Sequence, residues 1–102
     1  GPAIVSINHY AKMRQGCRFV SMSMKDSVYT AVYEGSGKAF AIVWTPENAP
    51  RQASLLPKGD LTTDMFGNRI ERKDAAISQN PVYVWVLTMR PSPKRQRLLA
   101  RN

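Results

Sequence analysis

Two pairs of carboxylates lie close enough in the sequence to suggest acid–base chemistry, Asp60 with Asp64 and Glu71 with Asp74. A glycosidase needs two such groups about 5 to 10 Å apart on either side of the bond that it hydrolyses. Asp64 is better explained by a tight turn, and Glu71 and Asp74 stand among three basic residues, as in a solvated loop. The sequence therefore predicts no hydrolytic centre.

Other reaction chemistries also lack their side chains. His9 is the only histidine and Cys17 the only cysteine, so the chain cannot supply a typical zinc site or a disulfide. We interpret Cys17 as a buried strand residue and His9 as a solvated helix residue. The glycines of residues 35–37 join two predicted strands instead of opening a helix, which is unlike a phosphate-binding loop. We predict a protein that is not an enzyme and needs no cofactor.

A β-hairpin is the clearest element, at residues 61–70. Asp64 suits the first position of a type I turn, where its carboxylate accepts backbone N–H groups. Gly67 suits the left-handed position that follows, which gives a G1-bulge hairpin. Phe66 lies at the tip, and Asn68 begins the return arm.

Short alternating segments predict strands elsewhere. In the last one, which Pro81 opens, Val82, Val84 and Val86 face one way, and Tyr83, Trp85 and Leu87 the other. The other predicted strands are residues 17–24, 28–33, 40–44, 52–56 and 75–78. Many short strands with turns between them predict an all-β, antiparallel, two-sheet β-sandwich with a short N-terminal helix.

The expected organisation is a single domain with short additions at both ends. Residues 1–2 are typical of the remnant left when a protease removes a tag, and residues 3–15 form a helical segment in which Ile4, Ile7 and Tyr10 recur at helical spacing. The sandwich covers residues 16–89, and residues 90–102 form a basic, disordered tail, with a frayed helix through Leu98 and Leu99 as the alternative. No apolar run approaches the roughly 20 residues of a membrane-spanning helix.

The positive charge is concentrated in the tail. The net charge is +8, of which residues after Leu87 carry +5 without any acid. A binding site for polyanions is therefore one alternative function, with contacts from Lys94, Arg95, Arg97 and Arg101. No aromatic residue is interleaved with these side chains, which disfavours nucleic-acid binding by base stacking.

A second alternative is a stand-alone carbohydrate-binding module. Sugar sites in β-sandwiches use exposed aromatic rings, and the candidate contacts are Trp44, Phe66 and Trp85. The alternation places Trp44 with Phe40 and Ile42, a stripe that more often forms core. Burial of Trp44 and Trp85 would favour a structural role, and two coplanar exposed rings would favour sugar binding.

Five short motifs in order resemble a known family. They are Gly-Cys-Arg-Phe-Val, Val-Tyr-Thr-Ala-Val-Tyr-Glu, Gly-Lys-Ala-Phe-Ala-Ile-Val-Trp, Asp-Met-Phe-Gly-Asn and Asn-Pro-Val-Tyr-Val, over roughly residues 16–86. The chain resembles the C-terminal β-sandwich that follows the (β/α)8 catalytic barrel in many glycoside hydrolases. The family's strand ending in tryptophan, its Gly-Asn turn and its closing Pro-Val-Tyr strand correspond to Trp44, to Gly67 with Asn68, and to Pro81 with Tyr83.

The resemblance implies a non-catalytic accessory domain of a carbohydrate-active protein. Such a domain packs beside a (β/α)8 barrel and stabilises it, and the barrel is absent from this chain. We expect Ile4, Ile7 and Tyr10 either to cover the boundary with that barrel or to pack wholly on the domain's own sheet. Without the barrel, this apolar surface predicts weak self-association.

Overall fold

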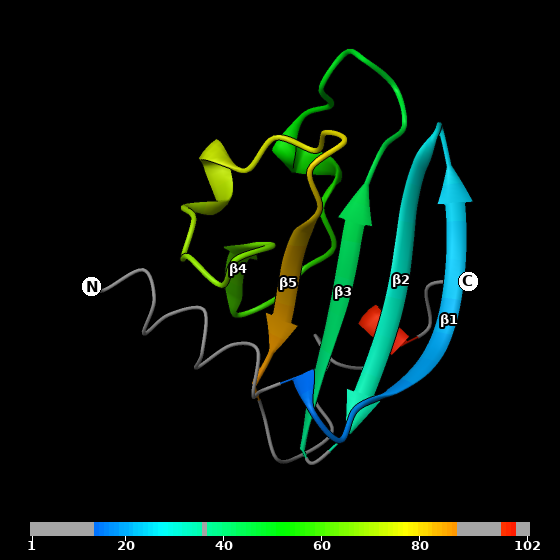
Figure 1. Cartoon of the computed structure of the whole chain (residues 1–102), viewed down its shortest axis with the longest axis vertical. Helices are drawn as coiled ribbons and strands as arrows, with labels where there is room; N and C mark the ends of the chain where they lie inside the picture. Colours follow the sequence, from blue (N-terminus) through cyan, green and yellow to red (C-terminus); the bar gives the residue numbers. More distant parts are fainter. Residues whose placement is uncertain (1–13, 36, 88–96, 100–102) are drawn as a thin grey trace.

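The computed structural model describes residues 14–35, 37–87 and 97–99, which contain one open antiparallel sheet of five strands (Figure 1). The order of the strands across the sheet is β1-β2-β3-β5-β4. The 3-10 helices η1 and η2 and a helical turn at residues 97–99 accompany the sheet. The bounds are β1 (Arg18–Lys25), β2 (Val28–Gly35), β3 (Lys38–Trp44), η1 (Ala53–Leu55), β4 (Leu61–Asp64), η2 (Arg72–Asp74) and β5 (Val82–Val86).

Tight turns join the first three strands. Asp26 and Ser27 connect β1 to β2 with φ of 53° and 64°, the left-handed conformation at both central positions of a type I′ turn. Gly37, with φ of 75°, lies in the loop between β2 and β3, where the sequence also predicts a hairpin. These short loops bring consecutive strands into direct pairing.

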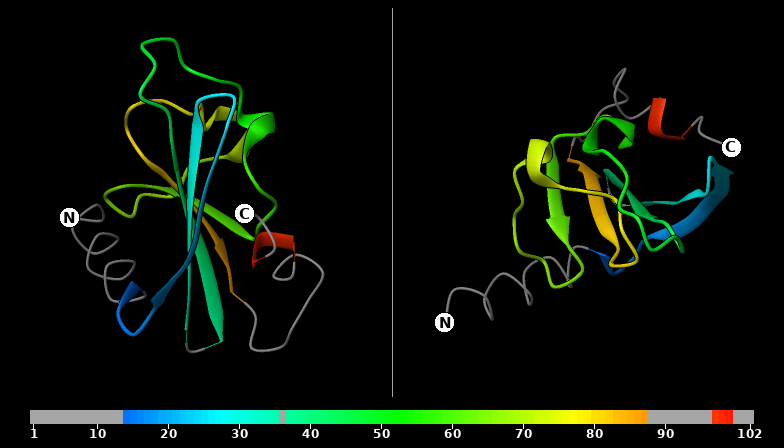
Figure 2. Two further views of the ribbon diagram at one scale, coloured as in Figure 1. Left: turned by 90° about the vertical axis from the view of Figure 1, so that its right-hand side faces the viewer. Right: turned by 90° about the horizontal axis from the view of Figure 1, so that it is seen from above.

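One face of the sheet, here called the valine face, carries the main core. Its side chains are small and branched, and they are almost completely buried: Val28, Val32, Ala39, Ala41, Val43, Val82, Val84 and Val86. Leu56, Ala75, Ile77 and Leu98 pack on them from the covering segments. Figure 2 shows η1, η2 and the turn at residues 97–99 on this same side of the sheet.

The prediction of a second sheet is wrong. Of its expected strands, residues 52–56 contain η1, and residues 75–78 contribute only an isolated bridge between Arg51 and Ile77. The two backbone hydrogen bonds of that bridge are 2.7 and 3.0 Å long. Pro46, Pro50 and Pro57 interrupt the covering segment, and proline cannot donate to a ladder. Irregular loops therefore cover the valine face where a sandwich would place strands.

The prediction of an N-terminal helix at residues 3–15 is also wrong for the described part of the chain. Residues 3–13, with Ile4, Ile7 and Tyr10, lie outside the described residues. The described chain reaches β1 through a turn at residues 14–16, which Gly16 ends with φ of 77°. At the other terminus, Leu98 is only 1% exposed, so this part of the basic segment belongs to the core.

Candidate interaction surface

The second face of the sheet, here called the aromatic face, carries rings in register. One row crosses all five strands and consists of Phe19, Tyr33, Phe40, Trp85 and Leu61, each opposite the next. Ring centroids are 5.7 Å apart for Phe19 and Tyr33, 5.1 Å for Tyr33 and Phe40, and 4.8 Å for Phe40 and Trp85. Cross-strand contacts of this kind stabilise a sheet beyond the area that they bury.

A second row lies nearer the β1–β2 turn. It pairs Met24 with Tyr29 and Tyr29 with Trp44. The Tyr29 and Trp44 rings are stacked, with centroids 5.4 Å apart and planes inclined by 13°. Because the two ring faces lie against each other, the rings present their edges to the outside and form no shared flat surface.

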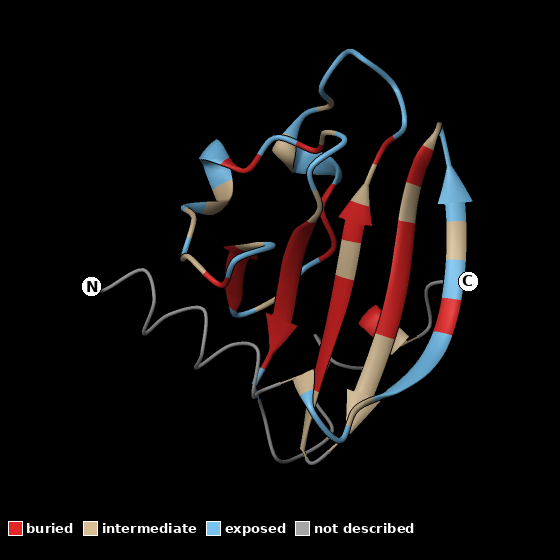
Figure 3. Cartoon of the chain, viewed as in Figure 1, coloured by how far each residue is buried: buried red, intermediate tan, exposed pale blue. Residues whose placement is uncertain are grey.

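Burial differs between the two ends of the sheet: β5 is buried, whereas most of β1 is exposed (Figure 3). In the long row, Trp85 is 1% exposed, Phe40 3% and Phe19 55%. Among the described residues, eight large hydrophobic side chains are exposed, and four of them belong to β1: Phe19, Val20, Met22 and Met24. Of the exposed hydrophobic residues that the structure describes, half therefore lie on β1.

Polar contacts fix the opposite end of the aromatic face. The indole N–H of Trp85 donates to the hydroxyl of Thr63 at 3.1 Å, a buried bond between β5 and β4. The Arg14 guanidinium donates to the Tyr83 hydroxyl at 2.9 Å, and its carbon lies 5.3 Å from the centre of that ring. These contacts fix the orientation of both rings.

The candidate sugar contacts do not gather on one platform. Trp44 and Trp85 share the aromatic face, but Trp85 is buried and Trp44 is half-buried against Tyr29. Phe66 is 56% exposed and lies apart, at the tip of the hairpin after β4. No two of these rings form the exposed coplanar pair that a sugar-binding face requires.

The hairpin at residues 61–70 has the predicted turn chemistry. The Asp64 carboxylate accepts the backbone N–H groups of Phe66 and Asn68, each at 2.9 Å, and the Asn68 side-chain amide at 3.1 Å. Gly67 has φ of 86° and donates its N–H to the Asp64 carbonyl. Asp64 and Asn68 are therefore engaged in holding the turn.

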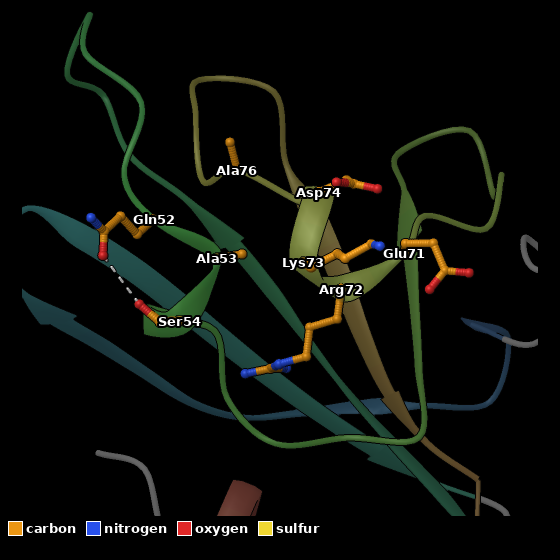
Figure 4. Close-up of a pocket in the computed structure, with 8 residues that line it drawn as sticks. All are labelled: Gln52, Ala53, Ser54, Glu71, Arg72, Lys73, Asp74 and Ala76. Atoms are coloured by element: carbon orange, nitrogen blue, oxygen red, sulfur yellow. Dashed lines mark hydrogen bonds between the residues drawn. The ribbon is translucent and has the colours of Figure 1, made fainter.

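The two carboxylate pairs considered for catalysis lie in different surroundings. Asp60 accepts the backbone N–H of Leu87 at 3.0 Å, at the end of β5. Glu71 precedes η2 and Asp74 is its last residue, and both line an open pocket of about 790 Å³ between η1 and η2 (Figure 4). Both are exposed, whereas a catalytic acid is normally tuned by burial.

Arg72, between those two acids, has a structural role. Its guanidinium donates to the carbonyl oxygens of Leu56 and Pro57 at 2.6 and 2.7 Å. These bonds attach η2 to the segment that follows η1. The pocket therefore lies where the covering segments that contain η1 and η2 meet.

The basic segment is only partly described. Arg97 is exposed on the turn at residues 97–99, while Lys94, Arg95 and Arg101 lie outside the described residues. No group of three or more His, Cys, Asp or Glu side chains suited to a metal ion occurs within residues 14–35, 37–87 and 97–99. No helix in the described part of the chain is long and apolar enough to cross a membrane.

Sequence reasoning missed the alignment of the rings across strands. In β2, β3 and β5 the two aromatic residues are two or four positions apart, so alternation alone places them on one face of each strand. The rows depend on register as well, and register follows from the turns between the strands.

Comparisons with models of known protein families, with curated proteins and with solved structures find no match.

Proposed function

We propose that this chain is a non-catalytic accessory domain, which packs the β1 end of its aromatic face against the catalytic (β/α)8 barrel of a glycoside hydrolase. The barrel is the partner that the sequence resemblance suggests. The observation that carries a docking role is the exposed apolar cluster of Phe19, Met22 and Met24 on β1.

The composition of this cluster favours a protein partner over a carbohydrate. Aromatic and methionine side chains are enriched at protein interfaces, and methionine adapts its shape to irregular apolar surfaces. A sugar platform instead needs open ring faces, and the stacked Tyr29 and Trp44 rings cover each other. The ring of Phe66 is exposed at the tip of the hairpin after β4, and no other candidate sugar-binding ring lies beside it.

The first experiment is to read the natural coding sequence upstream of Ala3 and to express the barrel found there without this domain. Adding the domain in trans should raise the melting temperature of the barrel, because a partner that binds only the folded state stabilises it. Absence of a (β/α)8 barrel from the natural protein would refute the proposed partner.

Matched variants then locate the contact. Phe19→Ser with Met24→Ser removes two β1 side chains that are 55% and 58% exposed. Phe66→Ser with Met65→Ser removes the same residue types, 56% and 43% exposed, from the hairpin tip. The first pair should abolish stabilisation of the barrel and the second should leave it unchanged. Equal losses in both pairs would contradict docking through β1.

A further inference from the structure

The outer edge of β1 is the second unusual feature of this end of the sheet. β1 pairs with β2 alone, and no described strand lies on its other side. An edge strand points every second N–H and C=O group outward, where another strand can pair with it. After a bulge near Val20, residues 21–24 pair regularly with β2 and contain neither a charge nor a proline.

The other edge of the sheet is closed. β4 has only four residues, and residues 68–70 run back along its outer side. The backbone N–H of Asp64 donates to Asn68 and that of Ile70 donates to Thr62, both at 2.9 Å. The contrast shows that this fold can protect an edge, and that β1 has no such protection within the described residues.

We propose that β1 binds an extended polypeptide segment as a sixth strand, and that this segment carries acidic residues at its ends. The charges on β1 select the occupant. Arg18 and Lys25 stand at the two ends of the strand, and both are exposed. One guanidinium nitrogen of Arg18 pairs with Glu34 at 2.8 Å, which leaves further donors of the fork for a second carboxylate.

A second copy of this chain fits the edge poorly. Antiparallel pairing of two β1 strands about a twofold axis, in the register of full overlap, would place Arg18 opposite Lys25 twice, and like charges opposite each other destabilise a sheet. The net charge of +8 adds repulsion between copies. An acid-ended strand from a different polypeptide has neither cost.

The side chains of β1 determine which residues the bound segment should carry between its acidic ends. Phe19, Met22 and Met24 project on the aromatic face, whereas Ser21 and Ser23 belong to the opposite side. The bound strand should therefore alternate apolar with small polar residues, so that its apolar side continues the aromatic face. This inference rests on the edge and its charges, and it does not require the partner to be a barrel.

A synthetic peptide of eight residues, the length of β1, tests the inference. It carries glutamate at both ends and alternates isoleucine with threonine between them. Binding to the whole chain is followed by fluorescence anisotropy, and its location by amide hydrogen exchange. One peptide should bind per chain and slow the exchange of β1 amides without changing that of β3 amides. A peptide with lysine at both ends should bind at least about tenfold more weakly.

Two matched pairs of variants complete the test. Met22→Lys should weaken binding by about tenfold, whereas Met65→Lys, at a similarly exposed methionine on the hairpin tip, should not change it. Lys25→Glu should remove most of the preference for the glutamate-ended peptide, because only Arg18 then remains as a cation on β1, and Lys58→Glu should leave the preference unchanged.

Three outcomes would overturn the inference. They are absence of binding, equal losses in Met22→Lys and Met65→Lys, and protection of amides outside β1. Loss of barrel docking with intact peptide binding would instead refute only the proposed function, so the two failures are distinguishable.

Discussion

The two ends of the sheet differ in how completely they are covered. At the β5–β4 end, all five residues of β5 are buried, and residues 68–70 cover the outer edge of β4. At the β1 end, only Ser21 among eight strand residues is buried, and the outer edge pairs with no described strand. The difference teaches that, among the described residues, β5 is central to the core and β1 contributes little to it.

In the covered half of the sheet, β5 is buried on both of its faces. Valines of β5 enter the valine face, while Tyr83 and Trp85 enter the aromatic face. A strand buried on both faces contributes most of its side chains to the core. β1 has no comparable role, because its apolar residues lie on one face and remain exposed.

The largest expected effect is at Trp85. Replacement by alanine removes a fully buried indole and its bond to Thr63, and should lower the free energy of unfolding by about 3–5 kcal/mol in urea denaturation. Trp85→Phe keeps a ring and loses the buried N–H bond, so it should cost about 1–2 kcal/mol. If Trp85→Ala lowered the free energy of unfolding no more than Trp85→Phe does, the covered half would not be the source of stability.

The next effect concerns closure of the valine face by the C-terminal segment. Leu98→Ala should cost about 2–4 kcal/mol in the same assay, because Leu98 is 1% exposed and packs in the main core. Leu87→Ala is the control, since Leu87 is 44% exposed and should lose less than about 1 kcal/mol. Equal values for the two leucines would show that residues 97–99 do not support the core.

A smaller effect is expected at Gly67, in the hairpin that covers the β4 edge. Gly67→Val places a β-branched residue at φ of 86° and should cost about 1–3 kcal/mol. Gly67→Asn is the control, because asparagine tolerates the left-handed region and should cost clearly less. Unchanged thermal melting of the valine variant would contradict the turn geometry.

The sequence was sufficient where a local pattern determines the structure. Alternation in residues 82–86 assigned Val84 and Trp85 to opposite faces, and Asp64 with Gly67 identified the hairpin turn. In both cases the determining interactions lie within a few residues of one another. Such elements need no knowledge of the rest of the chain.

The second layer could not be predicted in the same way. Residues 75–78 contain apolar positions suited to a strand, but Ile77 bridges only to Arg51, across a covering segment with three prolines. Short apolar runs fit strands and covering loops equally well, so the sandwich prediction failed there. Leu98 and Leu99 follow the basic residues of the tail, so the local sequence does not indicate what they pack against, and the core contacts of Leu98 come from residues distant in sequence.

The candidate surface was hidden for a related reason. Phe19 and Phe40 look alike in the sequence, and both lie in the row of rings that crosses the sheet. Only the order of the strands makes one an edge residue and the other a central one. The exposure of a strand residue is a property of the sheet, and it cannot be read from one strand alone.

The smallest expected effect on stability is at Phe19, and it tests this contrast directly. Phe19→Ala should cost less than about 1 kcal/mol, since the ring is 55% exposed and loses mainly its edge contact with Tyr33. Phe40→Ala, in the same row but 3% exposed, should cost about 3–5 kcal/mol.

Urea denaturation of the two variants under identical conditions gives the difference. A large gap would support the proposed docking through β1, because Phe19 would then contribute little to the stability of the domain itself. A cost at Phe19 that equals the cost at Phe40 would mean that the β1 end is ordinary core. Docking through this end of the sheet should then be abandoned.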